Sequence, residues 1–169
     1  MHTLITIFLV LLISYDAKSS EIEDPPYGIR FGQKFNASEH KTIQRRGNVR
    51  SVILKTANRP DDTEELRAEI CDDYGLQIIT WRSHIRSLAS ASASHNEILK
   101  EFEKKYGAPR INRKSAFWTS SNFQIVVKIR SKNNTHQNQI RYFGPRNKPC
   151  FNKLIAHQQE LERAPRKPK

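Results

Sequence analysis

The chain has 169 residues and a formal net charge of +12, and 37% of its residues are hydrophobic while 27% are charged. This composition supplies enough apolar side chains for one domain with a real core. The whole of the excess charge lies between Ala108 and Lys169, where 14 Lys and Arg residues face 2 acids. A charge this uneven attracts anionic partners, and two cysteines without a nearby histidine pair exclude a zinc site.

The first residues predict export. Residues 4–13 form an uncharged, mostly apolar run that is too short to span a bilayer but suits the core of a signal peptide. Ala17-Lys18-Ser19 provides a small-x-small cleavage site, so residues 1–19 are predicted to be a signal peptide and the protein to be secreted, to the cell exterior or a periplasm, with no transmembrane anchor. Only His2 stands where Lys or Arg is usual, which leaves an uncleaved anchor or a buried first strand as alternatives.

Export favours a disulfide between the two cysteines, Cys71 and Cys150. This is the only intramolecular pairing available. It would close a long loop and join the neutral part of the chain to the basic part.

Residues 20–48 are polar and rich in turn residues, which predicts a leader before a single domain at residues 49–162. Val49–Thr56 predicts a first strand and Leu76–Trp81 a second. Between them, Asp61-Asp62-Thr63 resembles a helix start and Gly75 a stop, so a short helix is expected there.

The next segment, Ser87–Ser94, is rich in Ser and Ala and is expected to be a connecting loop or a weak helical turn. A helix is then predicted from Ser94 to Tyr106, because Ser94 and Glu97 have capping-box spacing and Gly107 and Pro109 follow its end. Its apolar stripe consists of Ile98, Leu99, Phe102 and Tyr106.

After a basic linker at residues 110–114, Phe123–Arg130 alternates with period two and Gln139–Phe143 returns as its hairpin partner. Residues 151–162 are a candidate helix, and residues 163–169 are too charged and proline-rich to pack, which predicts a disordered basic tail. The expected fold class is α+β, with an antiparallel sheet of about four strands packed against a helix.

The hairpin supplies the candidate binding residues. Lys128, Arg130 and Arg141 are expected on the face opposite its apolar side chains, with Arg146 just beyond the second strand. Several cations on one rigid face can engage an anionic partner, which is a sulfated glycan, a nucleic acid or an acidic protein surface. The alternative is a solvated face that keeps the protein soluble and discourages edge pairing.

Four aromatic residues lie near these cations in the sequence: Phe117, Trp118, Tyr142 and Phe143. They are either stacking platforms for single-stranded bases or, more commonly, core residues.

Catalytic patterns are weak. The six histidines are scattered, and no P-loop, dinucleotide fingerprint or G-x-S-x-G motif occurs. A secreted ribonuclease or phosphodiesterase using His84 or His136 with Lys128 is therefore the alternative function, and no cofactor or metal is expected.

Two sequons, at Asn36 and Asn133, predict glycan acceptors in a eukaryotic secretory pathway, the second on the predicted hairpin turn. The dibasic pairs Arg45-Arg46 and Lys104-Lys105 leave a processed, hormone-like precursor as a third possibility.

Three segments carry a resemblance: Gly28-Ile29-Arg30-Phe31-Gly32, the helix end Lys105-Tyr106-Gly107-Ala108-Pro109, and Trp118 before the strand Phe123–Arg130. Here the chain resembles small exported modules of unknown function. The resemblance implies an α+β fold in which an antiparallel sheet is covered by the Ser94–Tyr106 helix, and it implies no catalytic or ligand residue. The resulting hypothesis is a secreted, non-enzymatic binder of an anionic partner.

Overall fold

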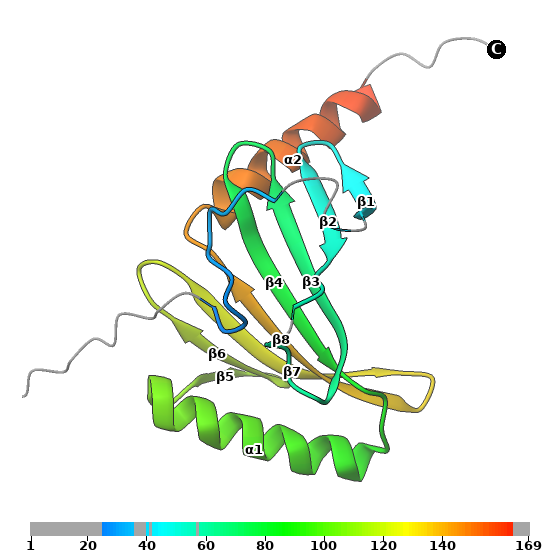
Figure 1. The fold of residues 1–169 in the computed structure, drawn as a ribbon, viewed down its shortest axis with the longest axis vertical. Coiled ribbons are helices and arrows are strands. Elements are labelled where there is room, and N and C mark those ends of the chain that lie inside the picture. Colours follow the sequence, from blue (N-terminus) through cyan, green and yellow to red (C-terminus); the bar gives the residue numbers. More distant parts are fainter. Residues whose placement is uncertain (1–24, 36–39, 41, 57, 164–169) are drawn as a thin grey trace, which may run out of the picture.

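The computed structural model describes residues 25–35, 40, 42–56 and 58–163 (Figure 1). The predicted signal peptide and most of the predicted basic tail lie outside these residues. The strands are β1 (Thr42–Arg46), β2 (Val49–Ile53), β3 (Thr63–Cys71), β4 (Gly75–Ser83), β5 (Arg110–Asn112), β6 (Ser115–Thr119), β7 (Gln124–Lys132) and β8 (Thr135–Phe143). The helices are α1 (Leu88–Tyr106) and α2 (Asn147–Arg163).

All eight strands form one antiparallel sheet in the order β1-β2-β3-β4-β8-β7-β6-β5. The predicted α+β class is confirmed, but the sheet has eight strands where about four were expected. Strands β1 to β4 pair consecutively, as do β5 to β8, and the two halves meet where β4 pairs with β8 (Figure 1). The predicted basic linker contributes the short edge strand β5.

The helix expected after Asp61 is wrong, because Thr63–Cys71 is strand β3. Leu66, Ala68 and Ile70 are buried, whereas the residues between them are partly exposed, which is the period of a strand. Asp61 and Asp62 resembled a helix start, but the segment that follows them pairs with β2 and β4. This pairing makes it a strand. Gly75, the expected helix stop, has a φ of 63° at the β3–β4 turn, and a Cβ there would collide with the carbonyl oxygen of Gly32.

Helix α1 begins at Leu88, six residues before the predicted start at Ser94. Of the two expectations for Ser87–Ser94, the connecting loop is therefore wrong and the segment is helical. Ser87 is the N-cap, and its hydroxyl accepts a hydrogen bond from the backbone N–H of Ser90 at 3.3 Å. Ala91 is completely buried and its carbonyl accepts a hydrogen bond from Asn138 Nδ2 on β8 at 3.1 Å. The small side chains therefore let the first half of α1 lie close to the sheet.

The end of α1 and its apolar stripe are as predicted. Gly107, with a φ of 80°, donates its N–H to the carbonyl of Glu103 at 2.8 Å. The stripe packs on the main core, where the ring centroids of Phe102 and Trp118 are 5.4 Å apart. The indole N–H of Trp118 donates to the Gly107 carbonyl at 2.8 Å, which joins the helix end to β6.

The main core lies on the face of the sheet that α1 covers. Its buried side chains come from six strands, from Leu54 and Phe123 next to strand ends, and from Ile29, which precedes the sheet. They include Leu66, Ile79, Ile125, Val127, Ile140 and Tyr142. The apolar side of the β7–β8 hairpin thus faces the core, as its alternating pattern predicted.

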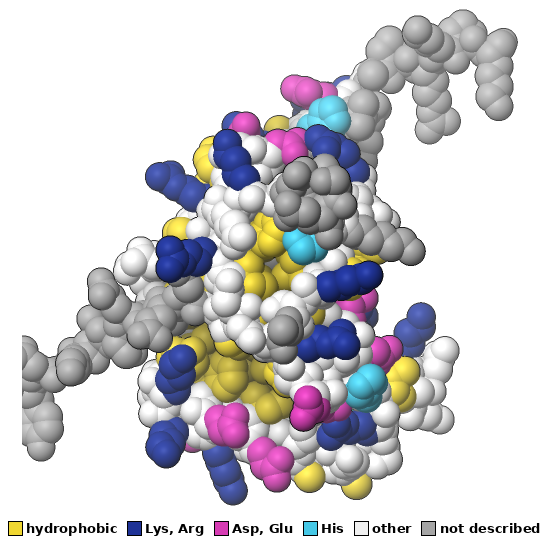
Figure 2. Space-filling view, in the orientation of Figure 1, with side chains coloured by type: hydrophobic (Ala, Val, Ile, Leu, Met, Phe, Trp, Pro, Cys, Tyr) yellow, Lys and Arg dark blue, Asp and Glu magenta, His cyan; other side chains and the backbone are white. Residues whose placement is uncertain are grey.

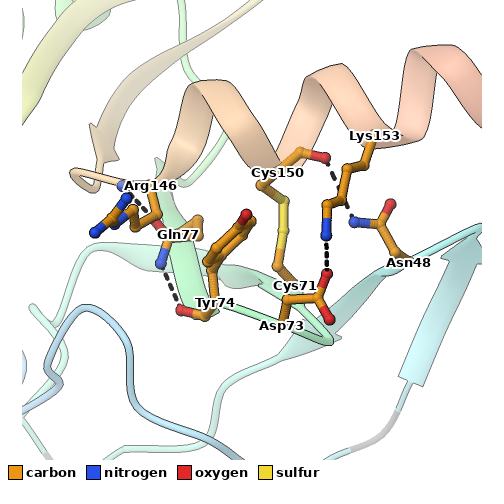
Figure 3. Close-up of a disulfide and its surroundings, with 8 residues drawn as sticks. All are labelled: Asn48, Cys71, Asp73, Tyr74, Gln77, Arg146, Cys150 and Lys153. Carbon is orange, nitrogen blue, oxygen red and sulfur yellow. Dashed lines mark hydrogen bonds and ion pairs between the residues drawn. A yellow bond between two sulfur atoms is a disulfide. The ribbon is translucent and has the colours of Figure 1, made fainter.

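Helix α2 is held at one end of the molecule by the disulfide between Cys71 and Cys150, as predicted (Figure 3). Both cysteines are buried in a second small cluster with Val49 and Leu154. Near the disulfide, the Lys153 ammonium donates a hydrogen bond to the Asp73 carboxylate at 2.6 Å. The helix starts at Asn147, four residues before the predicted start.

Candidate anion-binding face

The sheet face opposite α1, here called the basic face, is defined by strand register. Arg141 on β8 is paired with Thr80 on one side and with Val126 on the other, and Thr80 is paired in turn with Arg67. On β3, β4, β5, β7 and β8, seven cations share this face: Arg67, Arg82, Arg110, Lys128, Arg130, Lys132 and Arg141.

The predicted residues Lys128, Arg130 and Arg141 therefore share one face, opposite the buried Ile125, Val127 and Ile140. The sequence analysis missed Arg67 and Arg82. Arg67 could not be placed because its strand was taken for a helix, and Arg82 lies one residue beyond the predicted end of its strand.

Three acids from the first half of the chain, Glu64, Glu65 and Glu69, partly neutralise this face. Glu64 accepts a hydrogen bond from Gln137, the residue paired with Arg130. Glu65 Oε2 accepts a hydrogen bond from Arg67 at 2.9 Å, and its other oxygen lies 2.9 Å from Arg82 Nη1 as an ion pair without hydrogen-bond alignment. Glu69 lies 3.8 Å from Arg141. Among the described residues, Lys128 and Arg130 have no acidic partner within ion-pair distance, so the face keeps an excess of positive charge.

The cations lie close enough to affect one another. Burial lowers the pKa of Arg82, Glu65 opposes this, and Arg130, Arg67 and Arg141 lower it further. Burial likewise lowers the pKa of Arg141, against the attraction of Glu69 and with a smaller contribution from Arg130. Both groups stay protonated near neutral pH. Like charges held this close raise the free energy of the unbound state, and a bound anion would relieve this repulsion.

Buried hydrogen-bond donors without a partner also raise the free energy of the unbound state. The Nε–H groups of Arg67 and Arg82 are buried and have no hydrogen-bond partner among the described residues.

The four aromatic residues fall into two groups. Trp118 and Tyr142 are buried in the main core, which is the commoner of the two expected roles. Phe117 and Phe143 are partly exposed on the basic face, where the Arg141 guanidinium lies 4.7 Å from the centroid of the Phe143 ring.

Arg146 lies outside the sheet, in the connection from β8 to α2. Its backbone N–H donates to Gln77 Oε1 at 2.9 Å, and Figure 3 shows its side chain pointing away from the disulfide. An open hollow of about 240 Å³ lies beside this connection, and Gln124, Phe143 and Lys148 are among its lining residues. Arg146 is thus exposed at the end of the basic face, beyond the paired strands.

Figure 2 shows one face of the molecule, on which Lys and Arg side chains stand apart around the visible surface, with acidic side chains among them.

The described histidines lie away from the basic face. His136 is on β8 with the side chains that face α1, and its Nδ1 is 2.9 Å from Ser131 Oγ. His84 is exposed after β4. His95 on α1 is 3.1 Å from Asn138 Oδ1. The described residues also contain no cluster of three or more His, Cys, Asp or Glu that could hold a metal.

Of the two sequons, Asn36 lies outside the described residues, whereas Asn133 lies at the tip of the β7–β8 hairpin. Asn133 and Asn134 have φ values of 49° and 60°, as a two-residue type I′ turn requires, and both are exposed.

No family model, no curated protein and no solved structure matches the chain. Within the described part of the chain, neither helix is long and apolar enough to cross a membrane.

Proposed function

We propose that the protein is a non-enzymatic binder of an anionic polymer and that the basic face is its contact surface. One observation carries this proposal: the register places guanidinium groups from β3, β4, β7 and β8 side by side, and these cations outnumber the acids Glu64, Glu65 and Glu69 among them. A flat array of this kind can contact several anionic groups of one polymer at once, and binding releases the counterions of each.

The experiment compares two double variants with equal loss of charge. Lys128→Gln/Arg130→Gln removes two basic-face cations that, like Arg110 and Lys132, have no acidic partner among the described residues. Lys100→Gln/Lys104→Gln removes two exposed cations from α1, on the opposite side of the sheet. Binding is measured by fluorescence anisotropy with a labelled heparin fragment and a labelled single-stranded oligonucleotide.

Each exposed charge contact contributes up to about 1 kcal/mol, so the basic-face variant is expected to lose about tenfold in affinity. Its plot of log affinity against log salt should also become shallower by about one unit per lost contact. The α1 variant should bind within about twofold of the wild type. Equal losses in both variants would mean that net charge alone drives binding, and the proposal would fail.

We also infer that the protein works outside the reducing cytosol. The N-terminal run has the features of a signal peptide, and the bridge between Cys71 and Cys150 is consistent with an oxidising compartment. The exposed Asn133 turn is then a glycan acceptor.

A further inference from the structure

We propose that the polymer is a single-stranded nucleic acid, whose phosphates contact the cations of the basic face while its bases stack on Phe117 and Phe143. This inference rests on the proposed function, because it takes the same face as the contact surface. It adds a second kind of contact that charge alone does not supply.

The first support is the position of the two rings among the cations. Phe143 carries the Arg141 guanidinium 4.7 Å from its centroid. Phe117 is paired with Arg110 across β5 and β6, and on its other side with Val126 on β7. Each ring therefore has a cation beside it, which is the combination of aromatic platform and basic track that single-stranded nucleic acid binders use.

The second support is the distance between the rings. Phe117 is on β6 and Phe143 on β8, so one strand separates them, with Val126 and Gln124 between. At about 4.8 Å between strands and about 3.4 Å per residue along them, the two Cα positions are about 12 Å apart. Separate bases of one strand can then stack on the two rings, while a phosphate between them faces Arg141, which is level with Phe117 and two residues from Phe143.

The third support is the open hollow of about 240 Å³ beside Phe143. Its lining combines the Phe143 ring with amide and hydroxyl groups, from Gln124, Ser120, Asn122 and Asn147, and with the Lys148 ammonium. Amides and hydroxyls can hydrogen-bond the edge of an unstacked base, and the ammonium can contact its phosphate.

These contacts also predict selectivity. In a duplex the bases are stacked and paired, so they are not available to the two rings. A sulfated glycan has no base, so it would engage the cations alone. The protein should therefore prefer a flexible single strand to either.

The test replaces the rings without changing the charge. Phe117→Leu/Phe143→Leu keeps apolar side chains but removes both π faces, and Phe117→Tyr/Phe143→Tyr restores them. Phe151→Leu is the matched control, because Phe151 packs in the small cluster on α2. The probes are a labelled oligodeoxythymidylate, an abasic oligomer of the same length and a heparin fragment, and thermal unfolding confirms that each variant is folded.

The wild type should bind the oligodeoxythymidylate at least tenfold more tightly than the abasic oligomer. The double Leu variant should bind the oligodeoxythymidylate about tenfold more weakly than the wild type does and heparin with unchanged affinity. The Tyr variant and Phe151→Leu should bind all three probes as the wild type does. If the double Leu variant does not fold, Phe117→Leu alone should show a smaller loss in the same direction.

Equal affinity for heparin, abasic and thymidine oligomers, unchanged by the Leu substitutions, would overturn this inference and leave the proposed function standing. Absence of binding to all three probes would overturn both.

Discussion

At the residue scale, His95 shows how a polar contact attaches α1 to the sheet. Its Nδ1 is 3.1 Å from Asn138 Oδ1, and the amide nitrogen of Asn138 donates to the Ala91 carbonyl. The Asn138 side chain is completely buried, so its oxygen needs a donor, and His95 supplies one through Nδ1–H. Burial lowers the pKa of His95, and the hydrogen bond to Asn138 opposes this only in part.

This residue predicts a pH dependence of stability. Because the pKa of His95 is lower in the folded than in the unfolded protein, the unfolded state binds the proton more tightly. The stabilisation is present above the unfolded pKa of about 6.5 and is lost as the pH falls through the folded pKa. Urea unfolding should show that the free energy of unfolding falls less between pH 7.5 and pH 5 for His95→Gln than for the wild type.

The exposed His84 provides the control for this measurement. His84→Gln should lose as much stability on acidification as the wild type. An identical loss in His95→Gln would show that His95 does not contribute to the acid sensitivity.

At the element scale, α2 depends on its covalent bond. Apart from the apolar contacts of Cys150, Phe151 and Leu154, it is joined to the sheet by single polar contacts such as Lys153 with Asp73 and Asn48 Nδ2 with the Cys150 carbonyl. A disulfide that spans 79 residues is worth about 4.5 kcal/mol in the chain-entropy model.

Cys71→Ala/Cys150→Ala should therefore lower the free energy of unfolding by about 2 to 5 kcal/mol, as measured by urea titration. Limited proteolysis followed by mass measurement should give first cuts within α2, while the sheet and α1 stay intact. Simultaneous cleavage across the sheet would contradict this picture of α2 as the most weakly attached element.

The elements also show how far the sequence could predict this fold. The β7–β8 hairpin and the apolar stripe of α1 were predictable because each has a local period, and the disulfide was predictable because it was the only pairing available. Strand β3 was not, since its local signals favour a helix and its pairing with β2 and β4 depends on contacts between distant residues.

The same limit applied to the candidate site. The three cations of the hairpin were placed on one face by alternation, but Arg67 and Arg82 joined them only through the order of the strands. Which aromatic residues face the core and which face the basic side could have been predicted locally. Phe117 and Trp118 are neighbours in one strand, as are Tyr142 and Phe143, so the members of each pair must point to opposite faces.

At the scale of the whole molecule, export predicts a particular mature mass. In a eukaryotic secretory host, intact mass measurement should show a chain that begins near Ser20, with one disulfide and a glycan at Asn133. Asn133→Gln should remove that glycan and leave the fold unchanged, because the turn is exposed and amide side chains are not required there for packing. A chain that retains residue 1 would contradict the export prediction, and fragments ending at Arg46 would favour the hormone-like precursor.

The pairing of β4 with β8 has a consequence for how the chain reaches this structure. Each half of the sheet is a meander of consecutive strands, so its hydrogen bonds form between residues near one another in the sequence. The first meander, β1 to β4, can pair once its own residues are synthesised, whereas the second meander, the seam between β4 and β8 and the bridge to α2 must wait for later residues. Among the strand pairings of the described residues this seam has the largest loop-closure entropy, so we expect β4 and β8 to pair later than the strands within each half.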